Sequence, residues 1–332
     1  MSDIIINAAL LGMLATTAFL ALRLHHLFGV VILSGAFSLI AAALFIVLDG
    51  VDVAFTEAAV GAGFATMLAL AALRLVPITE KPHKIARIPA GLAVVTGLLL
   101  AVAITDLPRF GDPDAPIHTH VAPDYITGTK ADIGIPNVVT AVLASYRGYD
   151  TLGEVVVIFT ACIGVMLILS GGGTGRTAPR HAPAKTLSMH DDPVMRVVSK
   201  VLIPTILLFA LYVQFHGDFG PGGGFQAGVI FAAAFILNAI IFGFEQGRNA
   251  WPPRVNMAVL AAGVLLYGGT GLVAMLMDGA FLDYDFLRPD PRDGQHLGIL
   301  LVELGVGMTV AASMVALFFA FTEWRLQRLE ED

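Results

Sequence analysis

Charged residues are scarce in this 332-residue sequence: Asp, Glu, Lys and Arg make up 14% of it, whereas an ordinary soluble domain has about 25%. A soluble chain with so few charges would expose large apolar patches to water. Hydrophobic residues make up 57%, and the mean hydropathy is +0.81. This composition excludes an ordinary soluble protein and indicates one that lies in a lipid bilayer.

Several chemical motifs are also absent. The single cysteine, Cys162, allows neither an intrachain disulfide nor a multi-cysteine metal site. No block of like charges indicates nucleic-acid binding. The sequence has no phosphate-binding loop, no zinc or haem motif and no nucleophile elbow. We therefore expect neither an ATP-driven pump nor an enzyme, and no cofactor or bound metal.

Long apolar runs dominate what is present. A membrane-spanning helix needs about 17–25 mainly apolar residues. Nine segments meet or approach this length, so we expect an all-α, polytopic integral membrane protein with about nine transmembrane helices. The expected spans are Ile4–Leu22, Leu27–Leu48, Ala54–Val76, Ile88–Thr105, Leu152–Leu169, Val198–Phe215, Gly224–Phe244, Met257–Met277 and Leu297–Phe321.

The basic residues predict the orientation of these spans. With the N-terminus outside and nine crossings, most of the 19 Lys and Arg residues fall in cytoplasmic segments, as the positive-inside rule requires. Five fall outside, and three of these lie in one long loop, where the rule has less force. We therefore expect the N-terminus outside and the C-terminus in the cytoplasm. The five outer residues are Arg109, Lys130, Arg147, Arg288 and Arg292.

Two connecting segments differ from the rest. Residues 106–150 form a long outer loop that is rich in Pro and Asp and ends in a helix-like stretch, Asn137–Tyr146. Residues 171–197 begin with a Gly-rich run and continue with Pro, Arg and His, which is typical of a flexible linker. This cytoplasmic linker predicts a boundary between a module of about five spans and one of about four.

A charge inside a span costs about 3 kcal/mol on insertion scales, so the carboxylates there are informative. Asp49, Asp52 and Glu57 lie between two apolar spans that almost touch. They form either a cluster that accepts protons or a cation, or a tight turn in which Asp52 caps the next helix. We expect Asp49 to lie in solvent. Glu57 lies too far into the helix to cap it, which favours a functional role.

A second polar group precedes the span that starts near Leu152. Thr151 and Glu154 fit a capping box, in which both side chains bind free backbone N–H groups. A capping box does not account for Arg147 and Asp150 just before it. These two residues form either an interfacial ion pair or a support for an ion path.

A third group surrounds the glycine-rich segment between the sixth and seventh spans. Five glycines and one proline are accompanied by His216, Asp218 and Gln226, and Lys200 lies near the start of the preceding span. The glycines alone indicate a flexible hairpin. A flexible hairpin has no need of a histidine and an aspartate, and histidine titrates near neutral pH and can relay protons.

Glu303 lies about two turns into the last expected span, too deep to cap it. Gly305 and Gly307 would let another helix pack closely there. Glu303 is either paired with a neighbouring helix or a proton site, and intramembrane carboxylates are functional candidates. We expect His296, at the outer edge of this span, to lie at the membrane interface.

These segments resemble the Mrp (Mnh) family of multisubunit Na⁺/H⁺ antiporters and the membrane arms of membrane-bound hydrogenases. Residues 1–80, with Asp49-Gly-Val-Asp-Val-Ala-Phe-Thr-Glu57, resemble an MbhD-like three-helix domain. Residues 81–170, with Tyr146-Arg-Gly-Tyr-Asp-Thr-Leu-Gly-Glu154, resemble an MbhE-like two-helix domain with a long outer loop. Residues 198–332, with His216-Gly-Asp-Phe-Gly-Pro-Gly-Gly-Gly-Phe225, resemble the four-helix MnhB (MrpB) protein. In many Mrp complexes the first two domains form the C-terminal end of the large A subunit.

The resemblance implies a non-motor subunit of a monovalent cation (Na⁺ or K⁺)/proton antiporter in the bacterial cytoplasmic membrane. Its partners would be the other subunits of the complex, the lipid bilayer, Na⁺ and H⁺. Asp52, Glu57 and Glu154 match acidic positions near the family's proposed ion route. From the residues, the candidate ion or proton path also includes His216, Asp218 and Glu303, with Arg147, Asp150 and Lys200 in support. Alternatives are a membrane-arm subunit of a redox-driven pump and a purely structural membrane subunit.

Overall fold

The structure is a computed structural model that describes residues 2–73, 76–80, 87–170 and 192–331. Within these ranges nine helices are long and apolar enough to cross a membrane, which confirms the expected all-α, multi-pass fold. The nine spans are Ile4–Arg23, Leu27–Val47, Val51–Leu73, Arg87–Ile104, Gly148–Leu169, Pro193–His216, Gly224–Phe242, Pro253–Leu276 and Pro291–Trp324.

The helices fall into three consecutive regions. The first region contains α1 (Ser2–Arg23), α2 (Leu27–Val47), α3 (Val51–Thr56), the π-helix η1 (Glu57–Ala65) and α4 (Thr66–Leu73). The second contains α5 (Arg87–Ile104), α6 (Pro116–Thr119), α7 (Ala122–Gly128), η2 (Thr129–Ile133), α8 (Val138–Thr140), η3 (Ala141–Tyr146) and α9 (Gly148–Ser170). The third contains α10 (Pro193–His216), α11 (Gly224–Phe242), α12 (Phe244–Ala250), α13 (Pro253–Leu276), η4 (Tyr284–Leu287) and α14 (Pro291–Glu331). The helices α3, η1 and α4 together form one span.

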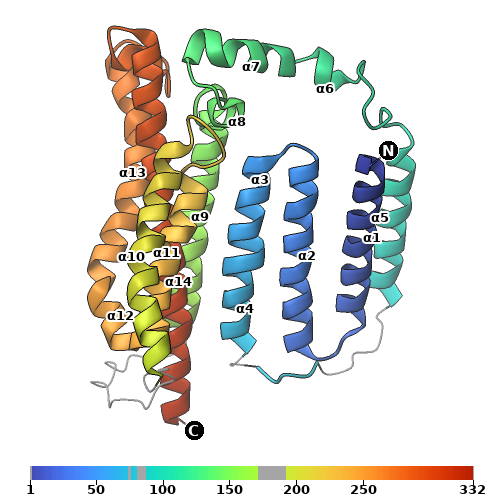
Figure 1. Cartoon of the computed structure of the whole chain (residues 1–332), viewed down its shortest axis with the longest axis vertical. Helices are drawn as coiled ribbons and strands as arrows, with labels where there is room; N and C mark the ends of the chain where they lie inside the picture. The colour runs from blue at the N-terminus through green and yellow to red at the C-terminus, as the bar shows by residue number, and fades with distance from the viewer. Residues whose placement is uncertain (1, 74–75, 81–86, 171–191, 332) are drawn as a thin grey trace.

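The spans run side by side, and α6 and α7 connect the two halves across one end of the molecule (Figure 1). The chain begins at that end, and α14 finishes at the other. We call these ends the N-terminal and C-terminal faces. Termini on opposite faces agree with an odd number of crossings among the described helices. Which face is cytoplasmic stays a prediction.

The long helix α14 is the centre of the third region and packs against α13, α11 and α9. Small residues permit this close packing. A Cβ atom on Gly228 would lie 2.8 Å from the Gly307 carbonyl oxygen, and one on Gly263 would lie 2.7 Å from the Gly305 carbonyl oxygen. Since lipid provides little hydrophobic drive for helix association, close backbone contact of this kind is a main source of stability.

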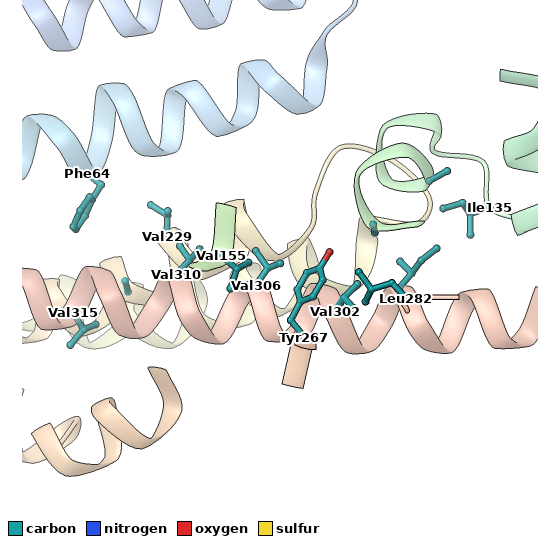
Figure 2. Packing of buried hydrophobic residues seen from close by; sticks show 14 of the residues in the cluster. Phe64, Ile135, Val155, Val229, Tyr267, Leu282, Val302, Val306, Val310 and Val315 are labelled. Atoms are coloured by element: carbon teal, nitrogen blue, oxygen red, sulfur yellow. The ribbon is translucent and has the colours of Figure 1, made fainter. Parts of the chain in front are cut away.

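One buried cluster contains residues of all three regions. Phe64 in η1 points away from the first region, toward the buried Val229 of α11 and Val310 of α14 (Figure 2). Val155 of α9 and Tyr267 of α13 belong to the same cluster. The three regions therefore share one core, although α5 of the second region is exposed along almost its whole length.

The start of the third region differs from the sequence expectation. Its first helix begins at Pro193 instead of Val198, because the Asp192 side chain accepts hydrogen bonds from the backbone N–H groups of Val194 (2.9 Å) and Met195 (3.3 Å). An Asp cap followed by Pro is a strong start signal. Residues 193–197 of the expected linker 171–197 therefore belong to α10. Residues 171–191 of that linker lie outside the described residues.

Candidate functional site

The glycine-rich segment between α10 and α11 forms a tight loop at the N-terminal face. Gly223 adopts φ +118°, a value that favours glycine, and its N–H donates to the Val213 carbonyl oxygen at 3.0 Å. A Cβ on Gly222 would lie 2.6 Å from the same carbonyl oxygen. The glycines allow residues 217–223, which we call the glycine loop, to fold back onto the end of α10.

The second region fixes this loop. The Asn137 side-chain amide donates to the carbonyl oxygens of Gly217 (2.8 Å) and Gly220 (3.0 Å). The Thr140 hydroxyl donates to the Gly217 carbonyl oxygen at 2.7 Å, and the Asn137 N–H donates to that of Asp218 at 3.2 Å. The flexible-hairpin interpretation is therefore wrong, because four hydrogen bonds from one neighbouring segment hold the loop.

The far end of the loop and the first residue of α11 provide N–H groups to two carboxylates. Gly222 donates to Asp52 Oδ1 at 3.2 Å, and Gly224 donates to Glu303 Oε2. Gly224 is also the first residue of α11, so the positive end of that helix dipole faces Glu303. Such an arrangement contributes up to about 2 kcal/mol in partly buried sites, which offsets much of the cost of the intramembrane charge.

Asp52 does not cap its helix. Gly50 is the N-cap residue of α3, and no side chain caps it. The Gln226 side-chain amide instead connects α11 to this part of α3, because it donates to Thr56 Oγ1 at 2.9 Å and to the Asp52 carbonyl oxygen at 3.3 Å. The capping interpretation of Asp52 was wrong, and the residue belongs to a contact between the first and third regions.

A cavity of about 230 Å³ lies where the three regions meet. It brings together one carboxylate from each region: Asp52, Glu154 and Glu303. No lysine, arginine or histidine is among the described residues that line it. The other lining residues are Val53, Thr56, Val139, Thr140, Leu143, Thr151, Gly222, Gly224, Phe225, Gln226 and Val306. The cavity is therefore acidic, with threonine hydroxyls and apolar walls between the carboxylates.

The predicted capping box of Thr151 and Glu154 is not present. Because α9 already begins at Gly148, Thr151 lies inside the helix, and its hydroxyl donates to the Leu143 carbonyl oxygen at 2.7 Å. Glu154 follows one turn later and faces the cavity. Glu154 therefore does not cap α9, and capping does not account for a carboxylate at this position.

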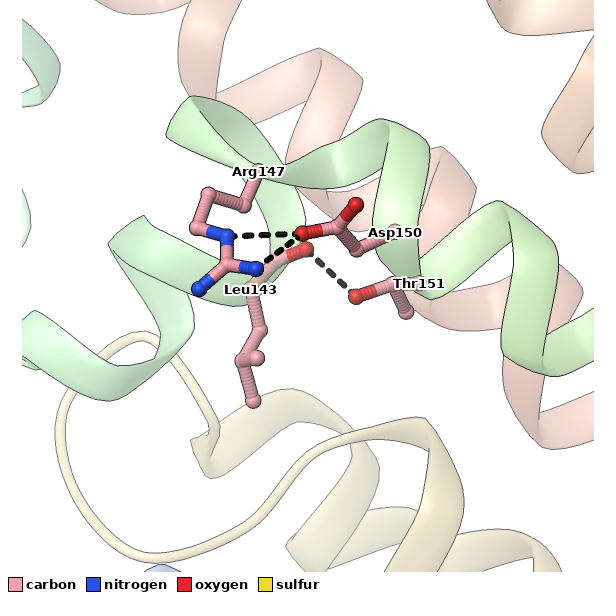
Figure 3. A network of polar contacts seen from close by, with 4 residues as sticks. All are labelled: Leu143, Arg147, Asp150 and Thr151. Carbon is pink, nitrogen blue, oxygen red and sulfur yellow. Dashed lines mark hydrogen bonds and ion pairs between the residues drawn. The ribbon is translucent and has the colours of Figure 1, made fainter.

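Arg147 and Asp150 form the expected ion pair. The Arg147 Nε–Asp150 Oδ2 distance is 2.7 Å, and a second guanidinium nitrogen lies 2.5 Å from the same oxygen (Figure 3). Both side chains are at least half exposed, and neither lines the cavity. Exposed pairs contribute about 0–1 kcal/mol, so the geometry favours an anchor at the start of α9.

Glu57 and Asp49 lie outside the cavity. Glu57 begins η1, and its carboxylate lies beside the Ser38 hydroxyl of α2, both against Gly61. It therefore faces the inside of the first region, at the start of a π-helical segment, a feature that is frequent at functional sites. Asp49 is exposed in the turn before α3 with φ +61°, as expected.

The remaining candidates lie around the glycine loop, with one exception. His216 ends α10, and its ring stacks on Tyr212 with the centroids 4.9 Å apart. Asp218 Oδ2 lies 3.5 Å from His296 Nδ1. Lys200 is exposed and lies 16 residues before His216 on α10, a separation of about 24 Å at 1.5 Å per residue. It takes no part in this site.

Sequence reasoning missed three participants. Asn137 and Thr140 were part of a helix-like stretch, and nothing local to them indicates that they hold a glycine loop some 80 residues away. His296 was expected to be interfacial. Its signal was its position seven residues before Glu303, which places both on one face of α14.

Comparison with known proteins agrees with this three-region architecture. Residues 194–316 match a domain related to the MnhB subunit of Na⁺/H⁺ antiporters. Residues 12–78 and 89–172 match the families described as subunits D and E of MBH. The fusion expected from the sequence is therefore confirmed.

Individual relatives match different shares of the chain. A putative antiporter subunit, mnhB2, of Staphylococcus aureus is 33% identical over 41% of this chain and 97% of its own length. An uncharacterized protein of Methanocaldococcus jannaschii is 29% identical over 54% of this chain and 74% of its own length.

Two solved structures share the fold. In the Mrp complex from Dietzia sp. DQ12-45-1b, one chain matches 94% of this chain at 26% identity, with a TM-score of 0.70. This chain spans only 34% of that one. In the archaeal membrane-bound sulfane sulfur reductase, one chain matches 70% of this chain at 28% identity, with a TM-score of 0.55. The match covers 97% of that reductase chain.

The fold and the cavity define a multi-pass membrane protein with an acidic cavity where three fused regions meet. Within that class, the chain belongs to the MnhB family of antiporter subunits, extended at its N-terminal side by MbhD- and MbhE-related domains. The Staphylococcus aureus relative is named a putative antiporter subunit, and this family assigns the chain to the subunits of transport complexes.

Proposed function

We propose that this chain is a non-motor subunit of a multisubunit monovalent cation/proton antiporter of the bacterial cytoplasmic membrane. It provides part of the ion path and a scaffold for its partner subunits, and has no enzymatic activity of its own. The proposal rests on one observation above all: Asp52, Glu154 and Glu303, from three separate regions, line one cavity.

The chemistry of this cavity suits a small cation or a proton. Carboxylate and hydroxyl oxygens are the ligands that hard cations prefer. Among the described residues, no three His, Cys, Asp or Glu side chains come close enough to form a metal site. Separate carboxylates in one cavity favour passage from one to the next over tight binding at a single point.

Among the described residues, backbone N–H groups, and no positively charged side chain, stabilise the charge of two of these carboxylates. Asp52 and Glu303 accept hydrogen bonds from Gly222 and Gly224, where the glycine loop joins α11. Since a backbone N–H cannot give up its proton to them, each carboxylate keeps the capacity to bind and release a proton or a cation. A structural ion pair with lysine or arginine would remove that capacity.

The test uses the complete complex, co-expressed with its partner subunits in everted membrane vesicles. Glu303→Gln keeps the size of the side chain and removes its charge, and we expect the initial rate of cation-dependent proton movement to fall at least about tenfold. The matched control is Asp124→Asn, which removes an exposed carboxylate on α7 outside the cavity. Normal flux in a Glu303→Gln complex with its normal set of subunits would contradict the ion-path role.

One observation favours a second candidate, a membrane-arm subunit of a redox-driven complex. This chain covers 97% of the length of the matching chain in the sulfane sulfur reductase. The partner subunits decide between the two candidates. Purification of the native complex with iron–sulfur subunits would favour the redox-driven complex, and purification with antiporter subunits alone would favour the antiporter.

A further inference from the structure

His296 and Asp218 form an ionisable pair just outside the cavity. Their side chains are 41% and 23% exposed, so solvent at the N-terminal face reaches the histidine more readily than the aspartate. His296 is the sixth residue of α14, and Asp218 is the second residue of the glycine loop. The pair therefore bridges the third region's longest helix and the loop that donates a hydrogen bond to Asp52.

The pair is aligned with Glu303. Seven residues separate His296 from Glu303, which is two helical turns and about 10 Å along the axis, so both side chains lie on the same face of α14. Asp218 is close enough to Glu303 to act on it electrostatically, as is Asp52. Exposure therefore falls from His296 to Asp218, and Glu303 lines the cavity two turns further along α14.

Other charged groups near His296 are engaged elsewhere. On η2, Asp132 accepts from the Tyr146 hydroxyl at 3.3 Å. On α14 itself, Arg292 donates to the Ala131 carbonyl oxygen at 2.6 Å. Asp285, before α14, accepts from Gln295 at 2.8 Å.

Two further charges, Lys130 on η2 and Asp293 on α14, are exposed, and His216 stacks on Tyr212. Asp218 is thus the carboxylate that faces His296 among the described residues.

Burial of the Asp218 carboxyl raises its pKa above the ordinary value, and the nearby His296 opposes this rise. A raised pKa makes the carboxyl a better proton acceptor than an ordinary exposed aspartate. The geometry and the environment of the pair therefore both suit proton exchange.

We propose that His296 and Asp218 are the proton-exchange pair that connects the N-terminal face with the acidic cavity. A proton from solvent binds the His296 imidazole. The Nδ1–H bond then breaks as an O–H bond forms on Asp218, and water carries the proton from Asp218 to the Glu303 carboxylate. The reverse sequence releases a proton. This proposal rests on the proposed function, since it assigns a route to the same cavity.

The test is made in everted vesicles with the complete complex. For His296→Ala, we expect the initial rate of cation-dependent proton movement to fall about tenfold or more and to lose the part of its pH dependence that a titrating imidazole contributes. Added imidazole, at tens of millimolar, is expected to restore at least half of the lost rate, because it supplies the missing titratable group. Asp218→Asn should lower the rate similarly without rescue by imidazole.

The matched control is His25→Ala. His25 Nδ1 lies 3.6 Å from Glu80 Oε2 in a similar pair at the C-terminal face, with side chains 74% and 54% exposed. We expect this variant to keep the original rate and pH profile. If His296→Ala fails to assemble, Asp218→Asn, which keeps the size of the side chain, decides the question.

Two results would overturn the exchange pair alone. One is an unchanged rate and pH profile in His296→Ala or Asp218→Asn while Glu303→Gln is inactive. The other is a uniform loss at every pH in His296→Ala that imidazole does not restore, since that result indicates a structural role. Full activity of Glu303→Gln as well would overturn the proposed function.

Discussion

The backbone N–H of Gly224, the first residue of α11, donates a hydrogen bond to the carboxylate of Glu303, which lies 79 residues further along the chain. This contact joins helix packing to the chemistry of the cavity, because the same glycine also lets α11 approach α14. Charge stabilisation at Glu303 therefore depends on the absence of a side chain at position 224.

We predict that Gly224→Ala destabilises the third region and separates Glu303 from α11. The added Cβ would lie 2.7 Å from the Val306 Cβ and 2.8 Å from the Gly307 nitrogen, and overpacking of this kind costs about 1–3 kcal/mol. Thermal unfolding of the purified protein in detergent should show a lower midpoint.

The control for this variant is Gly12→Ala in α1, where an added Cβ meets nothing within 4 Å. Alanine is favoured over glycine in a helix by about 1 kcal/mol, so the midpoint should stay the same or rise. Equal midpoints for Gly224→Ala and the original protein would mean that α11 and α14 can move apart at little cost.

A second prediction concerns the anchor of the glycine loop. Asn137→Asp keeps the Oδ1 acceptor that caps α8 through Val139 and Thr140, but replaces the amide that donates to Gly217 and Gly220. We expect the backbone amides of residues 219–224 to exchange hydrogen at least about tenfold faster, since the loop loses one buried and one partly buried hydrogen bond.

Asn249→Ala is a suitable control, because Asn249 is exposed on α12, far from the loop. Hydrogen exchange followed by mass spectrometry on loop peptides measures both variants. If exchange in the loop is the same in Asn137→Asp and in the original protein, the glycine turns alone fix the loop, and the second region has no part in positioning the cavity carboxylates.

The sequence predicted the spans well and the site only in part, for physical reasons. Nine apolar runs are a local property, and lipid leaves a chain few alternatives to helices. The partners of Asp52 and Asn137 lie far along the chain, and no local pattern encodes them. Glu57 lies close in sequence to Asp52 yet faces α2, whereas Glu303 was found because its depth in a span excludes capping.

The last prediction concerns two buried tyrosines that join the second and third regions. The Tyr284 hydroxyl donates to the Ala144 carbonyl oxygen at 2.9 Å, and the Tyr267 hydroxyl donates to that of Gly148 at 2.8 Å. Both side chains are fully buried. Burial also raises the pKa of the Tyr284 phenol, so it is a protonated donor at any pH at which the protein is studied.

We predict that Tyr284→Phe lowers the midpoint of thermal unfolding, because the Ala144 carbonyl loses its partner inside the protein, at a cost of about 1–3 kcal/mol. Tyr149→Phe is the matched control. Tyr149 is 73% exposed, and its ring contact with Phe281 is available to phenylalanine as well. A fall in midpoint as large in Tyr149→Phe as in Tyr284→Phe would show that the buried hydrogen bond is not what joins the two regions. A fall in Tyr284→Phe alone would place part of the chain's stability in this contact, directly beside the helix that carries Glu154.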